Sequence, residues 1–442
     1  MDKSYNIYLN NDDYKYYYQH IYKFCQSVNH ISYISFIFIS QYLYYLCHKD
    51  RLKLVKSLAK KIENMNIVYV KLFQAICNNS TLLSKEEQQF LIQYTDNVKY
   101  NETDIDQAGL NILRQYDDIF IEDTPINSGV VAIVYKGRYK EKQIVVKVLK
   151  QNIRPRILSA INDYELLFKI MSYIPYLKQL NLDKLLKNNK QILIDQIDFE
   201  KEIERQNNFL KSNEKLNWIT IPKVYTDLCN DIPNIIVMEY IDGFKINKID
   251  NVDMEIFGTL IIRFCIISII VNNIIHADMH SGNIIFIKND KADIIEEKYK
   301  IGIIDFGLCI EPSRENQYMY HMVINNLIIS KKFSLDIFNS NIIQPDHIKK
   351  SYTAPLRKEI MNKLNIVLDN YIKKNDMGPD MLIEFNIVLN KYNLYYSDEF
   401  NKILLSLSVC SETCKSFFND WLTIYSNELK KLNELNDLLE FD

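Results

Sequence analysis

The sequence predicts an α+β fold in which a β-rich lobe and an α-rich lobe follow a helical amino-terminal extension. Residues 1–110 are dominated by helical periodicity, residues 115–243 contain short β-branched segments separated by turns, and residues 244–442 return to helical periodicity around two apolar strands. A chain of 442 residues with 48% hydrophobic and 25% charged residues is globular. Since a domain typically has ~150 residues, a chain of this length has room for two or three domains.

Composition excludes several classes of partner and site. The formal net charge of −3 provides no overall basic field, so we expect no nucleic-acid partner. The eight cysteines are scattered without a Cys-x-x-Cys pair, which favours reduced thiols in an intracellular protein and argues against a zinc site. Cys410 and Cys414, one helical turn apart, are predicted to pack in the core. We see no secretory signal and expect a cytosolic or membrane-peripheral location.

The helical extension contains one very apolar stretch, Ile31–Cys47. No Asp, Glu, Lys or Arg occurs between Lys23 and Lys49, but serines recur within the stretch, and its many tyrosines suit an interface better than a lipid core. We therefore expect a buried or membrane-peripheral helix rather than a membrane span of about 20 apolar residues. Further along, Ser84 followed by Glu87 resembles a capping box that begins a new helix.

The β-rich lobe begins with a candidate phosphate-binding turn and a candidate phosphate-binding lysine. Residues 120–150 read as strand, turn, strand, charged hairpin and strand. The turn Ile126–Val134 contains small and turn-tolerant residues, so its backbone N–H groups can lie over phosphates. Lys147 lies within a β-branched strand, where its ammonium needs a partner such as phosphate oxygens or a glutamate. The alternative is an edge-strand lysine whose ammonium reaches water.

A charged helix further along can supply the partner of that lysine. In the segment Gln196–Leu210, Asp198 is positioned to cap the helix and Glu202 to point inward. Lys201 and Arg205 are expected to face water.

The two lobes are joined by a short linker. The pattern in residues 218–246 predicts a hairpin followed by a strand that ends at Glu239. Gly243, just after it, indicates a hinge. The linker backbone, at Glu239 and Ile241, is a candidate adenine site. Met254–Ile275 is very apolar and is predicted to be a core helix.

The α-rich lobe contains the residues that predict the chemistry. The segment His276–Phe286 places Asp278 and Asn283 five residues apart on a tight loop before an apolar strand. A second apolar strand ends at Asp305, and Gly307 is expected to free the backbone to turn away. A base and two oxygen ligands for Mg²⁺ are what phosphoryl transfer requires. Each motif alone is weak, but their joint order is that of protein kinases.

With these motifs the chain resembles the UbiB-type atypical kinases, also called the aarF-domain family. The resemblance runs from about residue 65 to about residue 312. The stretch "HADMHSGNIIF" (276–286) looks like the family's His-x-Asp-x-His-x-Gly-Asn loop, and "IPKVY", "VMEYIDG" and "IDFG" fall in the family's order. Two features are more specific: "VKLFQ" (70–74) resembles the family's Lys-x-Gly-Gln signature, and "QIDFEKE" (196–202) resembles its Glu-x-Asp segment. The resemblance implies a protein-kinase-like bilobal fold.

The resemblance also implies roles for individual residues. Asp278 is the expected base, Asn283 and Asp305 are the expected Mg²⁺ ligands, and Lys147, held by Glu202, is expected to bind the α and β phosphates. The expected ATP-binding set is Ile126, Asn127, Ser128, Gly129, Val130, Val131, Ala132, Ile133, Val134, Lys147, Glu202, Glu239 and Ile241. The family-specific positions are Lys71, Gln74 and Asp198. His276 and His280 are expected to brace the loop by hydrogen bonds.

Some positions depart from the family pattern. Phe73 replaces a glycine, Gln196 replaces the first glutamate, and "NSGV" (127–130) replaces an alanine-rich loop. In the family, the upstream helices are thought to cover the active site and limit access to protein substrates. A neutral Gln196 removes one ion pair from that arrangement. Ala277 stands where protein kinases often have arginine, which argues against control by activation-loop phosphorylation.

These observations predict an ATP- and Mg²⁺-dependent atypical kinase or ATPase. The acceptor of the γ-phosphoryl group is open: a protein Ser/Thr hydroxyl, or a lipid- or quinone-linked group. Two alternatives remain, a small-molecule kinase of the choline or aminoglycoside type and a pseudokinase in which nucleotide acts as a switch. A peripheral membrane or lipid contact is a further expectation.

Overall fold

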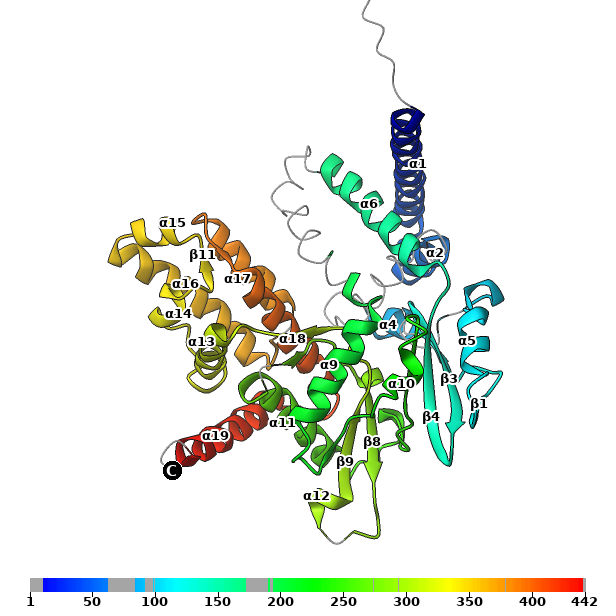
Figure 1. Ribbon diagram of the computed structural model, residues 1–442. Coiled ribbons are helices and arrows are strands. Elements are labelled where there is room, and N and C mark those ends of the chain that lie inside the picture. The colour runs from blue at the N-terminus through cyan, green and yellow to red at the C-terminus, as the bar shows by residue number, and fades with distance from the viewer. Residues whose placement is uncertain are drawn as a thin grey trace, which may run out of the picture. The chain divides into compact units, whose positions relative to one another are not determined.

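The computed structural model divides into two compact units, residues 1–98 with 152–194 and residues 99–151 with 195–442 (Figure 1). The residues that the structure describes are 11–62, 84–91, 98, 100–171, 190, 194–272, 274–292, 294–377 and 379–439. The domain boundaries expected from the sequence stay a prediction.

The first unit is helical. Its described helices of more than one turn are α1 (Asn11–His48), α2 (Arg51–Ile62), α4 (Lys85–Leu91) and α6 (Ile153–Met171). Helix α1 packs against α2 and α6, and α2 packs against α4. Among the described helices of the chain, none is long and apolar enough to span a bilayer.

The predicted capping box begins helix α4. The Ser84 backbone N–H donates to Glu87 Oε2 at 2.8 Å, and the Glu87 N–H donates to Ser84 Oγ at 3.3 Å. This reciprocal pair satisfies two backbone donors that the first helical turn leaves without intrahelical partners, so the prediction is confirmed.

The β-rich lobe of the second unit is an antiparallel sheet in the order β1-β3-β4-β6, with β2 paired to β3. Its strands are β1 (Ile119–Ile121), β2 (Asn127–Ser128), β3 (Ala132–Tyr139), β4 (Lys142–Leu149) and β6 (Ile235–Glu239). Alternating burial along β3 shows that one face of this sheet packs inside. Three short helices accompany the sheet: η2 (Glu102–Asp104), α5 (Gln107–Leu113) and α10 (Thr226–Cys229).

Helix α9 (Phe199–Ser212) belongs to the β-rich lobe and contacts β6. As predicted, Asp198 caps it, because its carboxylate accepts from the Lys201 N–H at 3.2 Å. The buried face of the helix includes Glu202, Gln206 and Phe209. The cap therefore fixes the start of the helix that supplies Glu202.

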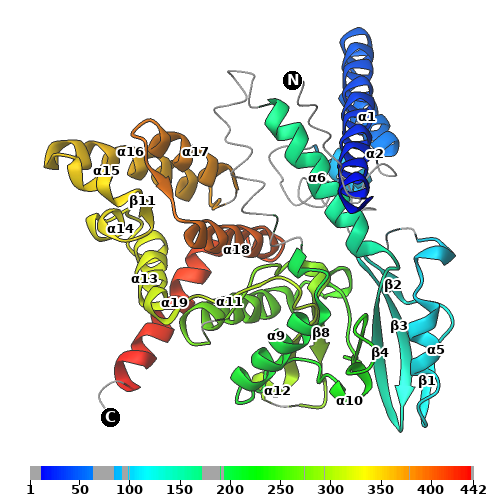
Figure 2. The ribbon, with the colours of Figure 1, turned by 45° about the horizontal axis from the view of Figure 1, so that its top comes forward.

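The α-rich lobe is built around α11 (Met254–Ile270), which is buried along most of its length, as predicted. Its other elements are η3 (Ile246–Lys248), β7 (Ile275–His276), η4 (Ser281–Asn283), α12 (Ile295–Lys298), β10 (Cys309–Ile310), α13 (Arg314–Ile324), a π-helical turn η5 (Asn325–Ile329), α14 (Leu335–Asn339), β11 (Ile343–Gln344), α15 (Asp346–Ser351), α16 (Ala354–Lys373), α17 (Pro379–Asn390), β12 (Tyr395–Tyr396), α18 (Asp398–Lys415) and α19 (Trp421–Leu439). Helices α18 and α19 pack against α11 (Figure 2).

A second sheet of three strands lies in this lobe: β5 (Ile219–Thr220), β8 (Ile284–Lys288) and β9 (Tyr299–Ile303). β5 runs parallel to β9, whereas β8 runs antiparallel to it. The hairpin predicted within residues 218–246 is reduced to one bridge, between Val224 and Met238, because Ile219–Thr220 pairs with β9 instead.

The linker between the lobes is held tightly to β8. Phe244 and Phe286 exchange two backbone hydrogen bonds, each 2.9 Å long. A Cβ atom on Gly243 would lie 2.5 Å from the Phe286 carbonyl oxygen and 2.6 Å from Ile285 Cγ2. Glycine is required here by close approach of the backbone, not by a left-handed conformation, since none of the described glycines has a positive φ.

We expect Gly243→Ala to lower the stability of the protein by about 1–3 kcal/mol, as overpacking of a filled site does. The matched control is Gly129→Ala, where the nearest atom to a new Cβ would be the Ala132 carbonyl oxygen at 3.5 Å. That variant should change stability by less than ~0.5 kcal/mol. The midpoints of urea unfolding without nucleotide test this. Equal midpoints for the two variants would contradict the tight linker.

Candidate active site

Lys147 joins the two lobes of the site. It lies on β4 opposite Val134 of β3 and Ile236 of β6, so it is not on an edge strand, and its side chain is buried. Its Nζ atom is 2.6 Å from Glu202 Oε1 and 3.2 Å from Asp305 Oδ2. The alternative of a lysine reaching water is therefore wrong.

The charges of this cluster support one another. Burial lowers the pKa of Lys147, but Asp305 and Glu202 outweigh burial and hold that pKa above its usual value. Burial raises the pKa of Glu202, and the nearby ammonium of Lys147 opposes this. For Asp305, burial favours the neutral acid, but Lys147 outweighs it and the pKa is lowered. An ammonium between two carboxylates is thus the stable arrangement at neutral pH.

The turn that presents Asp305 differs from the prediction. The left-handed residue is Asp305 itself, with φ of 70°, and not Gly307. The Gly307 N–H donates to Asp305 Oδ1 at 3.1 Å, and this bond stabilises the unusual conformation. A Cβ atom on Gly307 would lie 3.2 Å from Asp305 Oδ1 and 3.6 Å from Glu202 Oε2. The glycine therefore leaves room for two carboxylates.

Asp278 and Asn283 lie on one loop, as the sequence predicts. The Asn283 amide donates to the Asp278 carbonyl oxygen at 2.9 Å and to Asp278 Oδ2 at 3.3 Å. The backbone carbonyl of Asn283 accepts from the Ile304 N–H at 3.0 Å, which places Asn283 beside the turn of Asp305. The amide nitrogen of Asn283 thus orients Asp278, and its amide oxygen is an acceptor of the kind that Mg²⁺ prefers.

His276 and His280 brace the loop through hydrogen bonds, as predicted. His276 Nε2 donates to the Asp305 carbonyl oxygen at 2.7 Å, and its Nδ1 accepts from the Asp278 N–H at 3.3 Å. Burial lowers the pKa of His276, which agrees with a neutral ring protonated on Nε2. His280 Nδ1 accepts from the Gly282 N–H at 3.1 Å.

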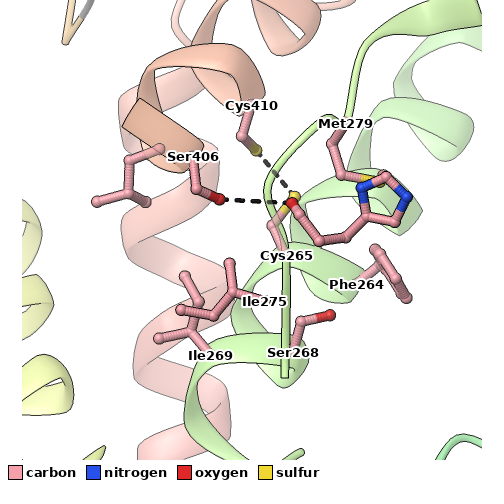
Figure 3. A pocket seen from close by; sticks show the side chains of 10 residues that line it. Phe264, Cys265, Ser268, Ile269, Ile275, Met279, Ser406 and Cys410 are labelled. Carbon is pink, nitrogen blue, oxygen red and sulfur yellow. Dashed lines mark hydrogen bonds between the residues drawn. The ribbon is translucent and has the colours of Figure 1, made fainter. Parts of the chain in front are cut away.

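Helix α18 supports the loop from behind, which sequence reasoning missed. Ser406 Oγ donates to the His276 carbonyl oxygen at 3.4 Å, and Thr413 Oγ1 donates to the Met279 carbonyl oxygen at 2.7 Å. A small enclosed space with room for about one water lies here (Figure 3). It is lined by Phe264, Cys265, Ser268, Ile269, Ile275, His276, Met279, Ser406, Leu407 and Cys410.

Three cysteines lie behind the loop. Cys410 Sγ is 3.0 Å from Cys265 Sγ and 3.8 Å from Cys414 Sγ, and all three side chains are buried. The predicted core packing of Cys410 and Cys414 is confirmed. These three small side chains fill the core between α11 and α18 and so support the loop from behind.

Arg205 is the second functional candidate that sequence reasoning missed. It was expected to face water, but its side chain is only 12% exposed. Its Nη1 donates to the Gly307 carbonyl oxygen at 3.1 Å, and its Nη2 pairs with Asp195 Oδ2 at 3.1 Å. Arg205 follows Glu202 by three residues and so lies near the same helix face, but this spacing alone does not separate a contact with the turn from a water-facing position.

The turn Ile126–Val134 forms a tight hairpin. The Gly129 N–H donates to the Ala132 carbonyl oxygen at 2.8 Å, and the Ile126 N–H donates to the Val134 carbonyl oxygen at 2.8 Å. Ser128 is buried, and its Oγ has no hydrogen-bond partner among the described residues. The buried apolar members of the turn are Val130, Ala132 and Ile133.

The other residues predicted for the site are not all found close to Lys147. The Glu239 carboxylate accepts from the Lys223 N–H at 3.3 Å and lies 3.4 Å from Lys142 Nζ, so this side chain faces away from the cluster of Lys147. Ile241 lies against Gly302 of β9. Lys71 and Gln74 lie outside the described residues. Gln196 has a buried side-chain oxygen without a partner among the described residues.

The buried, neutral state of His276 predicts a pH dependence of stability. Because the folded protein resists protonation of this ring while the unfolded chain accepts a proton near pH ~6.5, the unfolded state binds more protons below that pH. Stability should fall there, by up to about 1.4 kcal/mol per pH unit from this residue. His276→Asn should flatten that slope in urea titrations, and His347→Asn, at an exposed position, should not. An unchanged slope in His276→Asn would contradict the neutral ring.

The chain is similar in sequence to known proteins. A family model described as the ABC1 atypical kinase-like domain matches residues 97–334. Two proteins named probable protein kinase UbiB, from Actinobacillus pleuropneumoniae serotype 5b (strain L20) and serotype 7 (strain AP76), are 26% and 25% identical over 257 residues. Each alignment covers 54% of this chain and 46% of the relative, so the chain matches about half the length of these relatives.

Two solved structures are also similar. The complex of Rv3197 with erythromycin from Mycobacterium tuberculosis is 16% identical with a TM-score of 0.42, over 67% of this chain and 73% of that one. The Rio2 kinase complex with ADP/Mg²⁺ and phosphoaspartate from Chaetomium thermophilum is 13% identical with a TM-score of 0.30, over 73% and 94%.

The family model matches more than half of the chain. The resemblance to UbiB-type kinases is confirmed at the level of distant relatives. The two lobes also have the predicted α+β composition. The chain therefore belongs to the family of the ABC1 atypical kinase-like domain and has a kinase-like fold.

Proposed function

We propose that this chain binds ATP with Mg²⁺ and transfers the γ-phosphoryl group to an acceptor hydroxyl or to water. The observation that supports this most directly is the contact of Lys147 with both Glu202 and Asp305, at 2.6 and 3.2 Å. This contact couples the β-rich lobe, α9 and the turn of the expected metal ligand. Such a lysine and glutamate pair, together with an Asp-Phe-Gly aspartate, is the arrangement that phosphoryl transfer uses in kinases.

The residues fit a magnesium site. Asn283 and Asp305 supply an amide and a carboxylate oxygen on neighbouring strand ends, and Mg²⁺ takes one or two such ligands and completes its shell with phosphate oxygens and waters. When bound, the ion neutralises charge on the phosphates. Lys147 would then hold the α and β phosphates, and Glu202 would keep its ammonium in place.

Asp278 would act on the acceptor. Its carboxylate would orient the hydroxyl and take its proton as the new oxygen–phosphorus bond forms and the bond from the γ-phosphorus to ADP breaks. The Asn283 amide, 3.3 Å from Asp278 Oδ2, keeps the carboxylate in position. The turn Ile126–Val134 would cover the phosphates, and the linker backbone at Glu239 and Ile241 would receive the adenine.

The acceptor is proposed as a class only. A protein Ser/Thr hydroxyl and a lipid- or quinone-linked group both meet the chemistry, and both are more consistent with the family than a free small-molecule alcohol. In the family arrangement, protein substrates would be limited by contacts that involve Lys71, Gln74 and Asp198. Of these positions, the structure describes Asp198, which caps α9, the helix that carries Glu202.

The test is ATP turnover by the purified chain with Mg²⁺, alone and with candidate acceptors. Asp278→Asn should lower the rate by ~10²–10⁴ while nucleotide binding is retained, because only the proton-accepting group is lost. Asp305→Asn should abolish Mg²⁺-dependent turnover. Asp290→Asn, on the exposed hairpin between β8 and β9, is the control and should match the wild type.

Binding of ATP without turnover in the wild type would support a nucleotide-dependent switch in place of an enzyme. Turnover that is equal in Asp278→Asn and the wild type would remove the proposed role of Asp278. Phosphorylation of free alcohols, but of neither proteins nor lipid-linked groups, would favour a small-molecule kinase.

Arg205 should position the metal-binding turn. Its guanidinium holds the Gly307 carbonyl, and a hydrogen bond to a charged donor contributes about 1.5–3 kcal/mol. We therefore expect Arg205→Ala to raise the Mg²⁺ concentration needed for half-maximal ATP turnover at least tenfold. Lys201→Ala, which also removes an ion pair to Asp195, is the matched control and should leave that concentration unchanged. Equal Mg²⁺ dependence in the two variants would contradict a positioning role.

A further inference from the structure

Helix α1 presents an apolar face to solvent. Phe36, Ile39, Leu43 and Leu46 recur at spacings of three, four and three residues, so they share one side of the helix. Their exposed fractions are 67%, 60%, 57% and 42%. Large apolar side chains that are exposed as a contiguous row are rare on soluble proteins and mark interaction sites.

The opposite side of the same helix is packed. Ile31, Ile34 and Ile37 are buried, and α1 makes its contacts with α2 and α6 of the same unit. The helix is therefore held in place by one face while the other remains exposed. Burial of the exposed row against a further surface needs no rearrangement of this packing.

The composition of the exposed face fits a membrane interface. Tyr33, Tyr42 and Tyr44 are exposed beside the apolar row, and the helix carries no Asp, Glu, Lys or Arg after Lys23. Tyrosine combines an apolar ring with a polar hydroxyl and is favoured at the level of lipid headgroups. A dry protein interface would gain less from this many hydroxyl groups, because each would need a partner.

The next helix adds positive charge. In α2, Lys53, Lys56 and Lys60 are exposed and recur at spacings of three and four, so they also share one face. Helix α2 contains no acidic residue. Its Arg51 pairs with Glu87 at 3.2 Å, so that charge is partly neutralised.

One lysine of this row, Lys53, lies beside the aromatic end of α1, whereas Lys56 Nζ is 5.6 Å from the centre of the Phe90 ring in α4. Lys53 Nζ is 5.3 Å from the centre of the Tyr44 ring, and Lys49 Nζ is 5.7 Å from the centre of the Tyr45 ring. The apolar row and the lysine row therefore belong to neighbouring parts of one helical hairpin. Apolar side chains next to cations match the two layers of a lipid surface, acyl chains and anionic headgroups.

We propose that α1 and α2 form a docking surface for an anionic membrane, with α1 lying in the plane of the interface. Phe36, Ile39, Leu43 and Leu46 enter the boundary of headgroups and acyl chains, and the lysines of α2 contact the anionic headgroups. This goes beyond the proposed phosphoryl transfer and does not depend on it. The docking surface of α1 and α2 would bring the protein to a membrane that carries a lipid-linked acceptor.

The experiment is flotation of the full chain with vesicles of phosphatidylcholine alone and of an equal mixture with phosphatidylglycerol. The wild type should float with the anionic vesicles and only weakly with the neutral ones. High salt should weaken this binding without abolishing it, because screening acts on the lysines and not on the apolar row.

Two variants separate the apolar and charged contributions. Ile39→Ser with Leu43→Ser should weaken binding at least tenfold per side chain, since each buried aliphatic side chain contributes about 1.5–3 kcal/mol. The matched control is Ile383→Ser with Ile387→Ser on α17, two isoleucines with the same spacing and exposed fractions of 56% and 50%. This control should bind as the wild type does.

The charged variant replaces Lys53, Lys56 and Lys60 by glutamine. It should weaken binding to anionic vesicles about fivefold per lysine, at ~1 kcal/mol each. The control replaces the exposed Lys358, Lys373 and Lys430 by glutamine.

The proposal would be overturned if Ile39→Ser with Leu43→Ser floated as well as its control on α17. It would also be overturned if the variant of Lys53, Lys56 and Lys60 floated as well as its lysine control. A wild type that dimerises without lipid, and becomes monomeric in Ile39→Ser with Leu43→Ser, would overturn it as well. That result would assign the face to a second copy of the chain.

Discussion

The structure of the site depends on one buried ammonium. Lys147 sits in the middle of an antiparallel sheet, where an unpaired charge would be very costly, and it is stable there because Glu202 and Asp305 both approach it. The three residues come from a strand, a helix and a turn that are far apart in the sequence. Loss of one partner of such a buried pair typically costs about 3–5 kcal/mol, so the electrostatics of this cluster also determine how the lobes pack.

Around this cluster, further hydrogen bonds set the finer geometry. His276 connects the carbonyl of Asp305 with the N–H of Asp278, and Asn283 orients the carboxylate of Asp278. Arg205 fixes the other side of the same turn through Gly307. The expected base, Asp278, and the expected metal ligand, Asp305, therefore belong to one hydrogen-bond network. The partners in this network hold the two carboxylates in position.

Much of this could be predicted from the sequence, and the exceptions have physical causes. The order of motifs predicts the lobes, the cap at Asp198 and the pairing of Lys147, because local patterns and strong chemical needs determine them. The role of Arg205 depends on a long-range contact to Gly307, which a helical pattern cannot distinguish from a water-facing position. The sequence predicts that Gly307 lets the backbone turn, since glycine is the usual choice for unusual conformations, whereas the left-handed residue is Asp305 itself.

The tight pairing of the linker with β8 has a consequence for how the two lobes could open. Because Phe244 is paired with Phe286 and Gly243 has no spare volume, the chain cannot swivel at the glycine where a flexible joint would be expected. Any opening of the lobes has to pivot nearer β6, over the few residues between Glu239 and Gly243. Rotation about these residues would leave the pairing of Phe244 with Phe286 intact, so the end of the linker would stay with the α-rich lobe while the β-rich lobe moved.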